Sequence, residues 1–370
     1  VYEGWVIRKD WLEKAEMDAP VTVDQWHDVL AAFRDQFQPQ MPLALGSSGT
    51  YNSLTSAWTA AFISPMGGYN DTFCANPDGS VTFGPTSPEF KDYLETMHQW
   101  YQEGIISGDF VSFEMNGPFS TFTSVVTTGN SGIFPAQADY IDNYIETGRT
   151  TDPDYDLQGI VNIHRNADEA IPAHTVSSEL QSIFSVTAGP NAQLAAKWCN
   201  FWYSDVGARL CTYGIEGESY EVDENGVPQY TDLILHNPDG YSTDGMKMLY
   251  CVNYCTLFDP DAEKGTLSDT VEGVVEVWTA DQKINEAAQD VYSIVNLDYL
   301  TMTTEESEAF ATLNSDINTY VSEYTLKFIT GDVPLSEYDA YCETIASMGV
   351  DEVVGIVQDA YTRYTSRSGI

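Results

Sequence analysis

Residues 78–110, "DGSVTFGPTSPEFKDYLETMHQWYQEGIISGDF", join a tight turn, a short apolar run and an amphipathic segment without interruption. The Asp-Gly pair that opens the stretch predicts a hairpin turn. Ser87 stands at the expected helix N-cap, Pro88 at the first helical position, and Gly104 where the helix should end. This order of turn, strand and helix is typical of a protein that mixes strands and helices.

The same alternation extends toward the N-terminus. "YEGWVIRKDWLEKA" (2–15) predicts a strand that runs into a short helix. Thr22 and Gln25 have the spacing of a capping box at the start of the next helix. "PLALG" (42–46) then predicts a short strand and "SLTSAWTAAF" (53–62) a helix. We therefore expect α/β layers.

The rest of the chain continues this pattern and ends in helices. A strand, a helix and a further strand are predicted over 132–144 and 157–163. Residues 180–214 are predicted to form an apolar strand, a turn, and either one helix or a broken pair of helices that ends at Gly214. Asn225-Gly226 predicts a hairpin turn. Thr303 and Glu306 form a second capping box, which opens a long helix ending at "TGD" (330–332), and two shorter helices are predicted over 335–349 and 350–364.

Composition restricts the classes of function. The chain has 370 residues, of which 43% are hydrophobic and 19% charged, so we expect a globular protein with two or three domains. Fifteen Lys and Arg against 56 Asp and Glu give a net charge of −41, which excludes nucleic acid and anionic lipid as partners and suits a secreted or cell-surface protein. The six cysteines lack paired metal spacing, so free, mostly buried thiols are expected, with one disulfide left open.

No catalytic or metal motif is evident. The sequence contains no GxSxG, HExxH, GxxxxGKS or strand-following GxGxxG pattern, and its five histidines are scattered. Glu216 and Glu218 lie two apart on a predicted turn and are expected to diverge, which makes them a poor glycosidase pair. "NPDGS" and "DENG" lack a complete calcium loop and are predicted to be hairpin turns. We therefore predict no catalytic residue, metal or cofactor.

Aromatic residues make up 13% of the chain, a composition that suits carbohydrate because sugar C–H faces stack on flat rings. Most of these rings must nevertheless form core. Tryptophans in predicted amphipathic helices are expected to be packing residues; they are Trp11, Trp26, Trp198 and Trp202. For Trp58, which precedes the turn-rich "SPMGGYN", packing and ligand contact are equally open.

Four segments in chain order resemble the extracellular solute-binding proteins of ABC importers: residues 5–35, 78–110, "CTYGIEGESYEVDENGVP" (211–228) and "FITGDVPLSEYDAYCETIASMGVDEVVGIVQDAYTRY" (328–364). The pattern is similar to the LplA-like branch of family 1, which consists mostly of lipoproteins of Gram-positive bacteria. Tyr338 stands where this pattern often has Trp. Together the segments cover nearly the whole chain.

This resemblance implies a two-lobe, type II periplasmic-binding-protein-like fold with a helix-rich C-terminal third. It implies that residues 1–182 form mostly the C-terminal lobe and 183–302 mostly the remainder of the N-terminal lobe, with the helices of 303–370 packing across the lobes. Family members carry a further segment before "IRKDWL", so the N-terminal lobe would lack its opening strands here.

The resemblance also implies a function. A carbohydrate, in particular an oligosaccharide, would be captured in the inter-lobe cleft and delivered to membrane permease subunits, without a cofactor. The protein would be extracellular, monomeric and lipid-anchored in its full-length form. Binding of a peptide or another solute, a secreted glycoside hydrolase, and an adhesive surface protein remain alternatives.

Candidate ligand contacts come from the same placement. The turn after Tyr213 would border the cleft, with Gly214 at positive φ, although a turn that only braces the lobes carries similar weight. Asn70 follows a double glycine, where turn formation is the competing role. The predicted ligand-binding residues are Tyr51, Asn52, Trp58, Asn70, Gln137, Glu216 and Tyr220.

Overall fold

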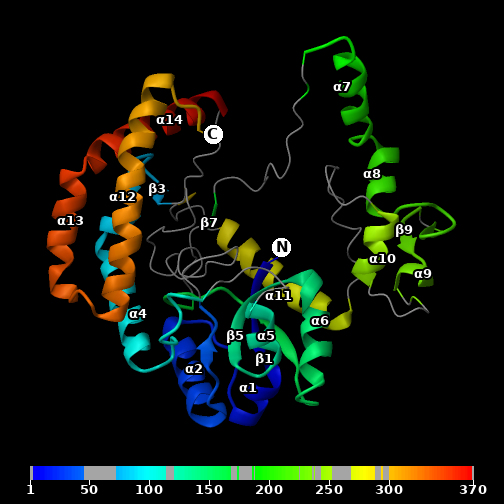
Figure 1. Cartoon of the computed structure of the whole chain (residues 1–370), viewed down its shortest axis with the longest axis horizontal. Coiled ribbons are helices and arrows are strands. Elements are labelled where there is room, and N and C mark those ends of the chain that lie inside the picture. Colours follow the sequence, from blue (N-terminus) through cyan, green and yellow to red (C-terminus); the bar gives the residue numbers. More distant parts are fainter. Residues whose placement is uncertain are drawn as a thin grey trace. The chain divides into compact units, whose positions relative to one another are not determined.

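The computed structural model describes residues 3–45, 72–113, 121–167, 173–174, 186, 188–224, 226–235, 237, 243–251, 268–287, 293–294 and 300–368 (Figure 1). The chain divides into two compact units. Unit 1 comprises Val1–Val176 and Gly273–Ile370, and unit 2 comprises Ser177–Glu272. The boundary between Glu272 and Gly273 falls inside helix α11 (Asp269–Ala287). The helix predicted over 53–62 lies outside the described residues.

A four-stranded mixed sheet forms the centre of unit 1. Its order is β2 (Met41–Leu43), β5 (Ser131–Gln137), β1 (Glu3–Arg8) and β6 (Leu157–Ile160). β1 is antiparallel to both neighbours, whereas β2 is parallel to β5. The apolar strands predicted from the sequence are therefore confirmed, and β1 pairs with β5 and with β6 across more than a hundred residues.

Four helices accompany the strands of this sheet: α1 (Lys9–Ala15), α2 (Val23–Phe37), α5 (Thr121–Thr127) and α6 (Ala138–Arg149). The predicted capping box opens α2, because the Thr22 side chain accepts from the Gln25 backbone N–H at 3.3 Å and Gln25 Oε1 accepts from the Thr22 backbone N–H at 3.1 Å. These two bonds satisfy N–H groups that a helix start leaves without an intrahelical partner.

A second, smaller sheet has the order β4 (Val81–Phe83), β3 (Phe73–Ala75), β10 (Ser293–Ile294) and β7 (Ala173–His174). The predicted turn joins β3 to β4, and Gly79 adopts φ 84° there. A short 3₁₀ helix, η1 (Gly84–Thr86), leads to α4 (Pro88–Gln102), where Ser87 Oγ accepts from the Phe90 backbone N–H at 3.1 Å. Residues 78–110 thus fold as their sequence predicts.

The C-terminal part of unit 1 consists of α12 (Thr304–Thr330), the 3₁₀ helix η3 (Leu335–Glu337), α13 (Tyr338–Ser347) and α14 (Val350–Ser368). α12 begins at the predicted Thr303–Glu306 capping box and ends at Gly331 with φ 84°. The buried Tyr338 donates its hydroxyl hydrogen toward the carbonyl oxygens of Ser87, at 2.7 Å, and Pro85, at 3.2 Å. The Tyr338 hydroxyl thus contributes hydrogen-bonding contacts in addition to the packing of the ring.

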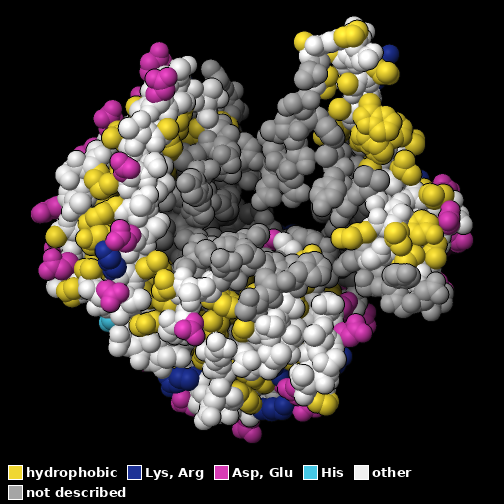
Figure 2. Space-filling model, in the orientation of Figure 1, with side chains coloured by type: hydrophobic (Ala, Val, Ile, Leu, Met, Phe, Trp, Pro, Cys, Tyr) yellow, Lys and Arg dark blue, Asp and Glu magenta, His cyan; other side chains and the backbone are white. Residues whose placement is uncertain are grey.

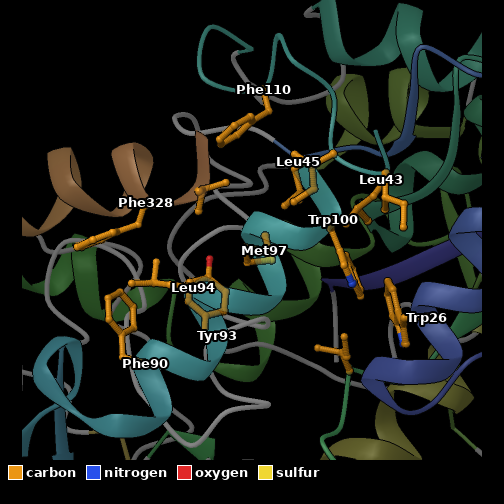
Figure 3. Packing of buried hydrophobic residues seen from close by; sticks show 14 of the residues in the cluster. Trp26, Leu43, Leu45, Phe90, Tyr93, Leu94, Met97, Trp100, Phe110 and Phe328 are labelled. Carbon is orange, nitrogen blue, oxygen red and sulfur yellow. The ribbon is translucent and has the colours of Figure 1, made fainter. Parts of the chain in front are cut away.

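One apolar core connects these layers (Figure 3). Trp26 meets Trp5 edge to face, with ring centroids 5.5 Å apart. Trp11 is 5% exposed and Trp26 is fully buried, so their predicted packing role is confirmed. Other members come from β2, α4, the segment after α4, and α12: Leu43, Leu45, Phe90, Tyr93, Leu94, Met97, Trp100, Phe110 and Phe328.

α11 is fixed to the central sheet of unit 1 by its own side chains. Trp278 covers Gly4, and its Nε1 donates to the Trp5 carbonyl oxygen at 2.9 Å. A Cβ on Gly4 would lie 2.5 Å from the Trp278 ring, and one on Gly159 would lie 2.9 Å from Val274 Cα. The two glycines allow the helix to approach the strands this closely.

Unit 2 contains α7 (Ala192–Phe201), α8 (Asp205–Thr212), the hairpin β8 (Tyr220–Val222) to β9 (Pro228–Tyr230), α9 (Asp232–Leu235) and α10 (Thr243–Tyr250). The hairpin, with Gly226 at φ 81°, was predicted, and of the two alternatives left open for 190–214 the structure shows the broken pair of helices. Its small core consists of Tyr213, Tyr220, Tyr230, Ile234, Met246 and Cys251.

The packing role predicted for Trp198 is wrong for this structure. Its side chain is 62% exposed, and α7 contains no buried residue. Trp198 meets Trp202, which is half-buried, edge to face at 5.2 Å. Helical periodicity specifies that a helix has an apolar face, but it does not specify what covers that face.

Candidate functional site

The turn at residues 213–220 of unit 2 is held by a dense set of local hydrogen bonds. Gly214 adopts φ 83°, and a Cβ there would lie 2.5 Å from Ser219 Oγ. Ser219 Oγ accepts from the Ile215 backbone N–H at 2.7 Å and donates to the Tyr213 carbonyl oxygen at 2.6 Å. Gly217, at φ 79°, donates its N–H to the Tyr220 carbonyl oxygen at 2.8 Å. The predicted positive φ at Gly214 is confirmed, and the turn is preorganised.

Within this turn the structure brings two predicted ligand residues together. The Tyr220 hydroxyl donates to Glu216 Oε2 at 3.4 Å. The Tyr220 ring is only 5% exposed and lies 5.5 Å from the Tyr213 ring, whereas Glu216 is exposed. Burial, together with the adjacent Glu216 carboxylate, raises the pKa of Tyr220 above its ordinary value. The turn therefore exposes the Glu216 carboxylate, which accepts a hydrogen bond from the Tyr220 hydroxyl. The rings of Tyr213 and Tyr220 pack against each other.

Gln137 occupies a comparable position in unit 1, at the end of β5 and at the N-cap of α6. It is half-buried, and its Nε2 donates to Glu3 Oε1 at 2.5 Å. Glu3 lies directly opposite Gln137 in the antiparallel register and is exposed. An amide and a carboxylate at this strand end offer both donors and acceptors. Glu3 was not predicted, because its partner is 134 residues away and only the strand pairing reveals it.

The other four predicted ligand residues fall within residues 46–71, which lie outside the described part of the chain: Tyr51, Asn52, Trp58 and Asn70. Gln137 belongs to unit 1, and Glu216 with Tyr220 to unit 2. Their predicted shared role in ligand binding stays a prediction.

A hollow of about 430 Å³ opens in unit 1, lined by Gln40, Met41, Asp109, Ser112, Phe113, Ser124, Val125, Thr128 and Asn130. Several of its polar groups already bond one another: Asn130 Nδ2 donates to Thr128 Oγ1 at 2.9 Å, and Ser112 Oγ to the Asp109 carbonyl oxygen at 3.0 Å. None of the three described predicted ligand residues lines it. The hollow and the predicted contacts are therefore separate features.

A charge cluster surrounds the buried Arg8. Its guanidinium donates to both oxygens of Asp10, at 2.7 and 2.8 Å, and to Asp152 at 2.6 Å. It also lies over the rings of Trp11 and Tyr155, at 4.6 and 4.1 Å from their centroids. Burial opposes the charge of Arg8, but the hydrogen bonds that it donates to Asp10 and Asp152, together with the negative charge of Asp10, outweigh this effect and raise the pKa of Arg8. The cluster ties α1 to the segment before β6 and has a structural role.

The buried histidine of unit 1 also has a structural role. His164 Nε2 lies 3.0 Å from Asp281 Oδ1, and Asp281 Oδ2 accepts from Asn162 Nδ2 at 2.9 Å. Across the described residues, no three His, Cys, Asp or Glu side chains are arranged to hold a metal ion. Five cysteines there are free thiols, three of them buried, and Cys255 lies outside that part of the chain. No helix in the same part of the chain has the length and apolarity to cross a membrane.

Comparison with known proteins gives relatives that match nearly the entire chain, although no family model matches it. A fructooligosaccharide ABC transporter substrate-binding protein of Streptococcus pneumoniae, FusA, is 20% identical over 370 residues, covering 97% of this chain and 65% of that protein. YtcQ of Bacillus subtilis, a polygalacturonan/rhamnogalacturonan-binding protein, is 22% identical over 374 residues, covering 97% of this chain and 68% of that protein.

A solved structure shows the same fold. It is an HMO-binding, ABC-transporter-associated solute-binding protein from Bifidobacterium longum infantis, with a TM-score of 0.72 and 20% identity, covering 99% of this chain and 74% of that chain. The chain is similar over nearly its whole length to substrate-binding proteins of ABC transporters. The chain accordingly has the two-lobe periplasmic-binding-protein-like fold that the resemblance of its sequence implies.

The length of the match is also informative. The chain spans about two thirds of the length of the two relatives, at 65% and 68%, while nearly all of its own residues are matched. The relatives therefore contain a substantial stretch of polypeptide that has no counterpart among these 370 residues.

Proposed function

We propose that this protein is the substrate-binding component of an ABC importer and that its ligand is a carbohydrate, specifically an oligosaccharide. The observation that carries the proposal is the match over 97% of the chain to two relatives whose names specify the binding of fructooligosaccharide and of polygalacturonan or rhamnogalacturonan. The similarity therefore extends over nearly the whole chain and is not confined to one shared domain.

In the proposed mechanism the protein binds the ligand and delivers it to the permease without changing it chemically. The ligand would contact both lobes and bind the closed arrangement more tightly than the open one, and that difference in affinity would shift the population toward closure. The closed complex would then dock on the membrane permease. No bond of the ligand is broken, and no metal or cofactor takes part.

The proposed ligand contacts use the chemistry of sugar hydroxyls. Glu216 would accept a hydroxyl hydrogen, with Tyr220 orienting its carboxylate, and Gln137 would donate or accept beside Glu3. Trp58 would stack on a sugar face. Tyr51, Asn52 and Asn70 complete the proposed set.

The proposed setting is the outer face of the cell. FusA is named as an ABC transporter substrate-binding protein, a class that captures solutes outside the membrane, and the net charge of −41 suits an extracellular surface. The full-length protein would be held at the membrane by a lipid anchor, act as a monomer, and have the permease as its protein partner.

The direct test is a thermal-shift screen against fructo-, galacturono- and milk-type oligosaccharides, with short peptides as controls. A ligand at a hundred times its Kd stabilises the folded state by about 2.7 kcal/mol, which raises the Tm measurably. Small-angle scattering at saturating ligand should show a smaller radius of gyration. Release of a shortened sugar would identify a hydrolase, and an unchanged radius of gyration would contradict closure.

Two variants in one turn then test the site. Glu216→Ala should weaken binding of the identified sugar by about 10-fold or more, since hydrogen bonds to charged groups contribute about 1.5–3 kcal/mol. Glu218→Ala is the matched control, because it removes an exposed carboxylate from the same turn. Equal affinities for the two variants would remove Glu216 from the site while leaving the transport role itself intact.

A further inference from the structure

Two of the proposed contact sites lie in the described part of the chain, and each exposes a carboxylate. Glu216 is exposed in the turn at residues 213–220, and its Oε2 accepts from the Tyr220 hydroxyl at 3.4 Å. Glu3 is exposed at the start of β1, and its Oε1 accepts from Gln137 Nε2 at 2.5 Å. In both pairs the neutral partner already donates to its carboxylate. The remaining lone pairs of the two carboxylates are the acceptors that a ligand can reach.

These exposed acceptors require hydrogen-bond donors on the ligand. An ionised carboxylate only accepts hydrogen bonds, whereas a hydroxyl group can also donate one. Sugar hydroxyls therefore match Glu216 and Glu3. A uronic acid, sulfate or phosphate group would instead place a second anion beside them, and proteins normally hold such groups with Arg or Lys. The function proposed above leaves open whether the oligosaccharide carries such a group.

The segment around Glu216 adds negative charge. Residues 213–231 contain no Lys or Arg, and five acidic residues of this segment are exposed: Glu216, Glu218, Glu221, Asp223 and Glu224. Arg209 of α8 lies near the Tyr220 hydroxyl, where it opposes the effects of burial and of Glu216 that raise the pKa of Tyr220. It is one positive charge beside five negative ones. The electrostatic field at the turn therefore favours a neutral ligand over an anion.

Many cations of the chain are already bound to carboxylates. Eight of the fifteen Lys and Arg residues form ion pairs within unit 1: Arg8, Lys9, Lys14, Arg34, Arg149, Arg165, Lys327 and Arg363. Figure 2 shows acidic side chains spread over the described part of the face in view, with few basic ones between them. With a net charge of −41, the chain as a whole also repels an approaching anion. The charges of the described surface therefore act in the same direction as those of the contact sites.

We propose that the carboxylates of Glu216 and Glu3 select an oligosaccharide that carries no acidic group. This inference rests on the proposed function and concerns the class of sugar rather than the transport role. The hydroxyls of such a sugar donate to the two carboxylates, whereas an acidic group on the ligand would lie beside them as a like charge. Each pair of like charges at about 4 Å weakens binding by about 5-fold in water, and by more where water is excluded.

A glycan array followed by calorimetry tests this selection. The array contains neutral and acidic oligosaccharides, and we expect the protein to retain neutral ones. The hydroxymethyl groups of a neutral hit are then oxidised to give the uronic acid, and this acid is compared with its methyl ester, which lacks the charge. We expect the acid to bind about 10-fold more weakly than the ester, or weaker still, at low salt. High salt should reduce this ratio, because exposed charges are screened.

The possible results separate this inference from the proposed function. An acid that binds as tightly as its ester would overturn the selection and leave the carbohydrate-binding function in place. An array on which only acidic oligosaccharides are retained would do the same. An array that retains no oligosaccharide would overturn the proposed function, and this inference with it.

Two variants that each remove one charge test the role of Glu216. Glu216→Gln keeps the size of the side chain and one acceptor oxygen, so the ratio of ester to acid affinity should fall by about 5-fold. Glu343→Gln is the matched control, because it changes the net charge equally at an exposed position on α13, which carries none of the proposed contacts. It should leave the ratio within about 2-fold of wild type. Equal ratios in the two variants would overturn the role of Glu216 in this selection.

Discussion

Replacing Asp281 with alanine should destabilise unit 1 more than any exposed substitution on the same helix. Asp281 is 3% exposed and lies on α11. One of its carboxylate oxygens lies 3.0 Å from His164 Nε2, and the other accepts from Asn162 Nδ2 at 2.9 Å and from the Asn162 backbone N–H at 3.2 Å. The carboxylate thus connects α11 to the segment that follows β6, 117 residues earlier in the chain.

The expected loss in the free energy of unfolding depends on the buried donors that lose the Asp281 carboxylate as their acceptor. A buried donor without an acceptor costs about 1–3 kcal/mol. His164 is 5% exposed, so its ring nitrogen would lose its acceptor in an almost dry site, whereas the half-buried Asn162 has better access to water. We therefore expect Asp281→Ala to lower the free energy of unfolding by about 2–4 kcal/mol. Asp281→Asn keeps one acceptor oxygen and should lose less.

The assay must report on unit 1, since a chain with two units need not unfold in one step. Hydrogen exchange of peptides from α11 and β6, combined with urea denaturation, measures the local and the overall loss. Glu276→Ala is the matched control: it removes an exposed carboxylate from the same helix and should stay within about 0.5 kcal/mol of wild type. If the Asp281 and Glu276 variants are equally stable, the buried network does not hold α11 in place and the reasoning is refuted.

Three further predictions concern packing and titration in unit 1. Gly4→Ala should cost about 1–3 kcal/mol in denaturation experiments, because its Cβ would lie 2.5 Å from the Trp278 ring; a neutral result would show that α11 shifts freely. The Arg363 guanidinium holds the pKa of Glu306 below its ordinary value of 4.5. The Tm of Arg363→Ala should therefore lie below that of the wild type at neutral pH, and this difference should shrink as the pH falls through the lowered pKa. A difference in Tm that does not change with pH would contradict this. Burial raises the pKa of Cys74 to about 12, so its thiol should resist thiol reagents at about pH 8 until the protein is unfolded; labelling of the native protein there would contradict its burial.

Much of the local structure was accessible from the sequence because its determinants lie within four residues of one another. The capping boxes at Thr22 and Thr303, the Ser87 cap, the Asp-Gly turn and the β8–β9 hairpin with Gly226 at positive φ all appear as predicted. Each depends on a side chain that bonds a nearby backbone group, or on a glycine that tolerates positive φ, and neither requires a distant partner. The sequence also contains the four segments that resemble the solute-binding proteins of ABC importers.

The tertiary structure decided which residues meet across the chain. Gln137 faces Glu3, and Asp281 faces His164, only because strands and a helix from distant segments pack together. The exposure of Trp198 likewise depends on which neighbours cover α7, and the burial of the Tyr220 ring depends on Tyr213 lying beside it. The sequence by itself determined the caps, turns and apolar faces, because these follow from short-range hydrogen bonding and periodicity. Only the folded chain determined the partners of those faces, because long-range packing sets them.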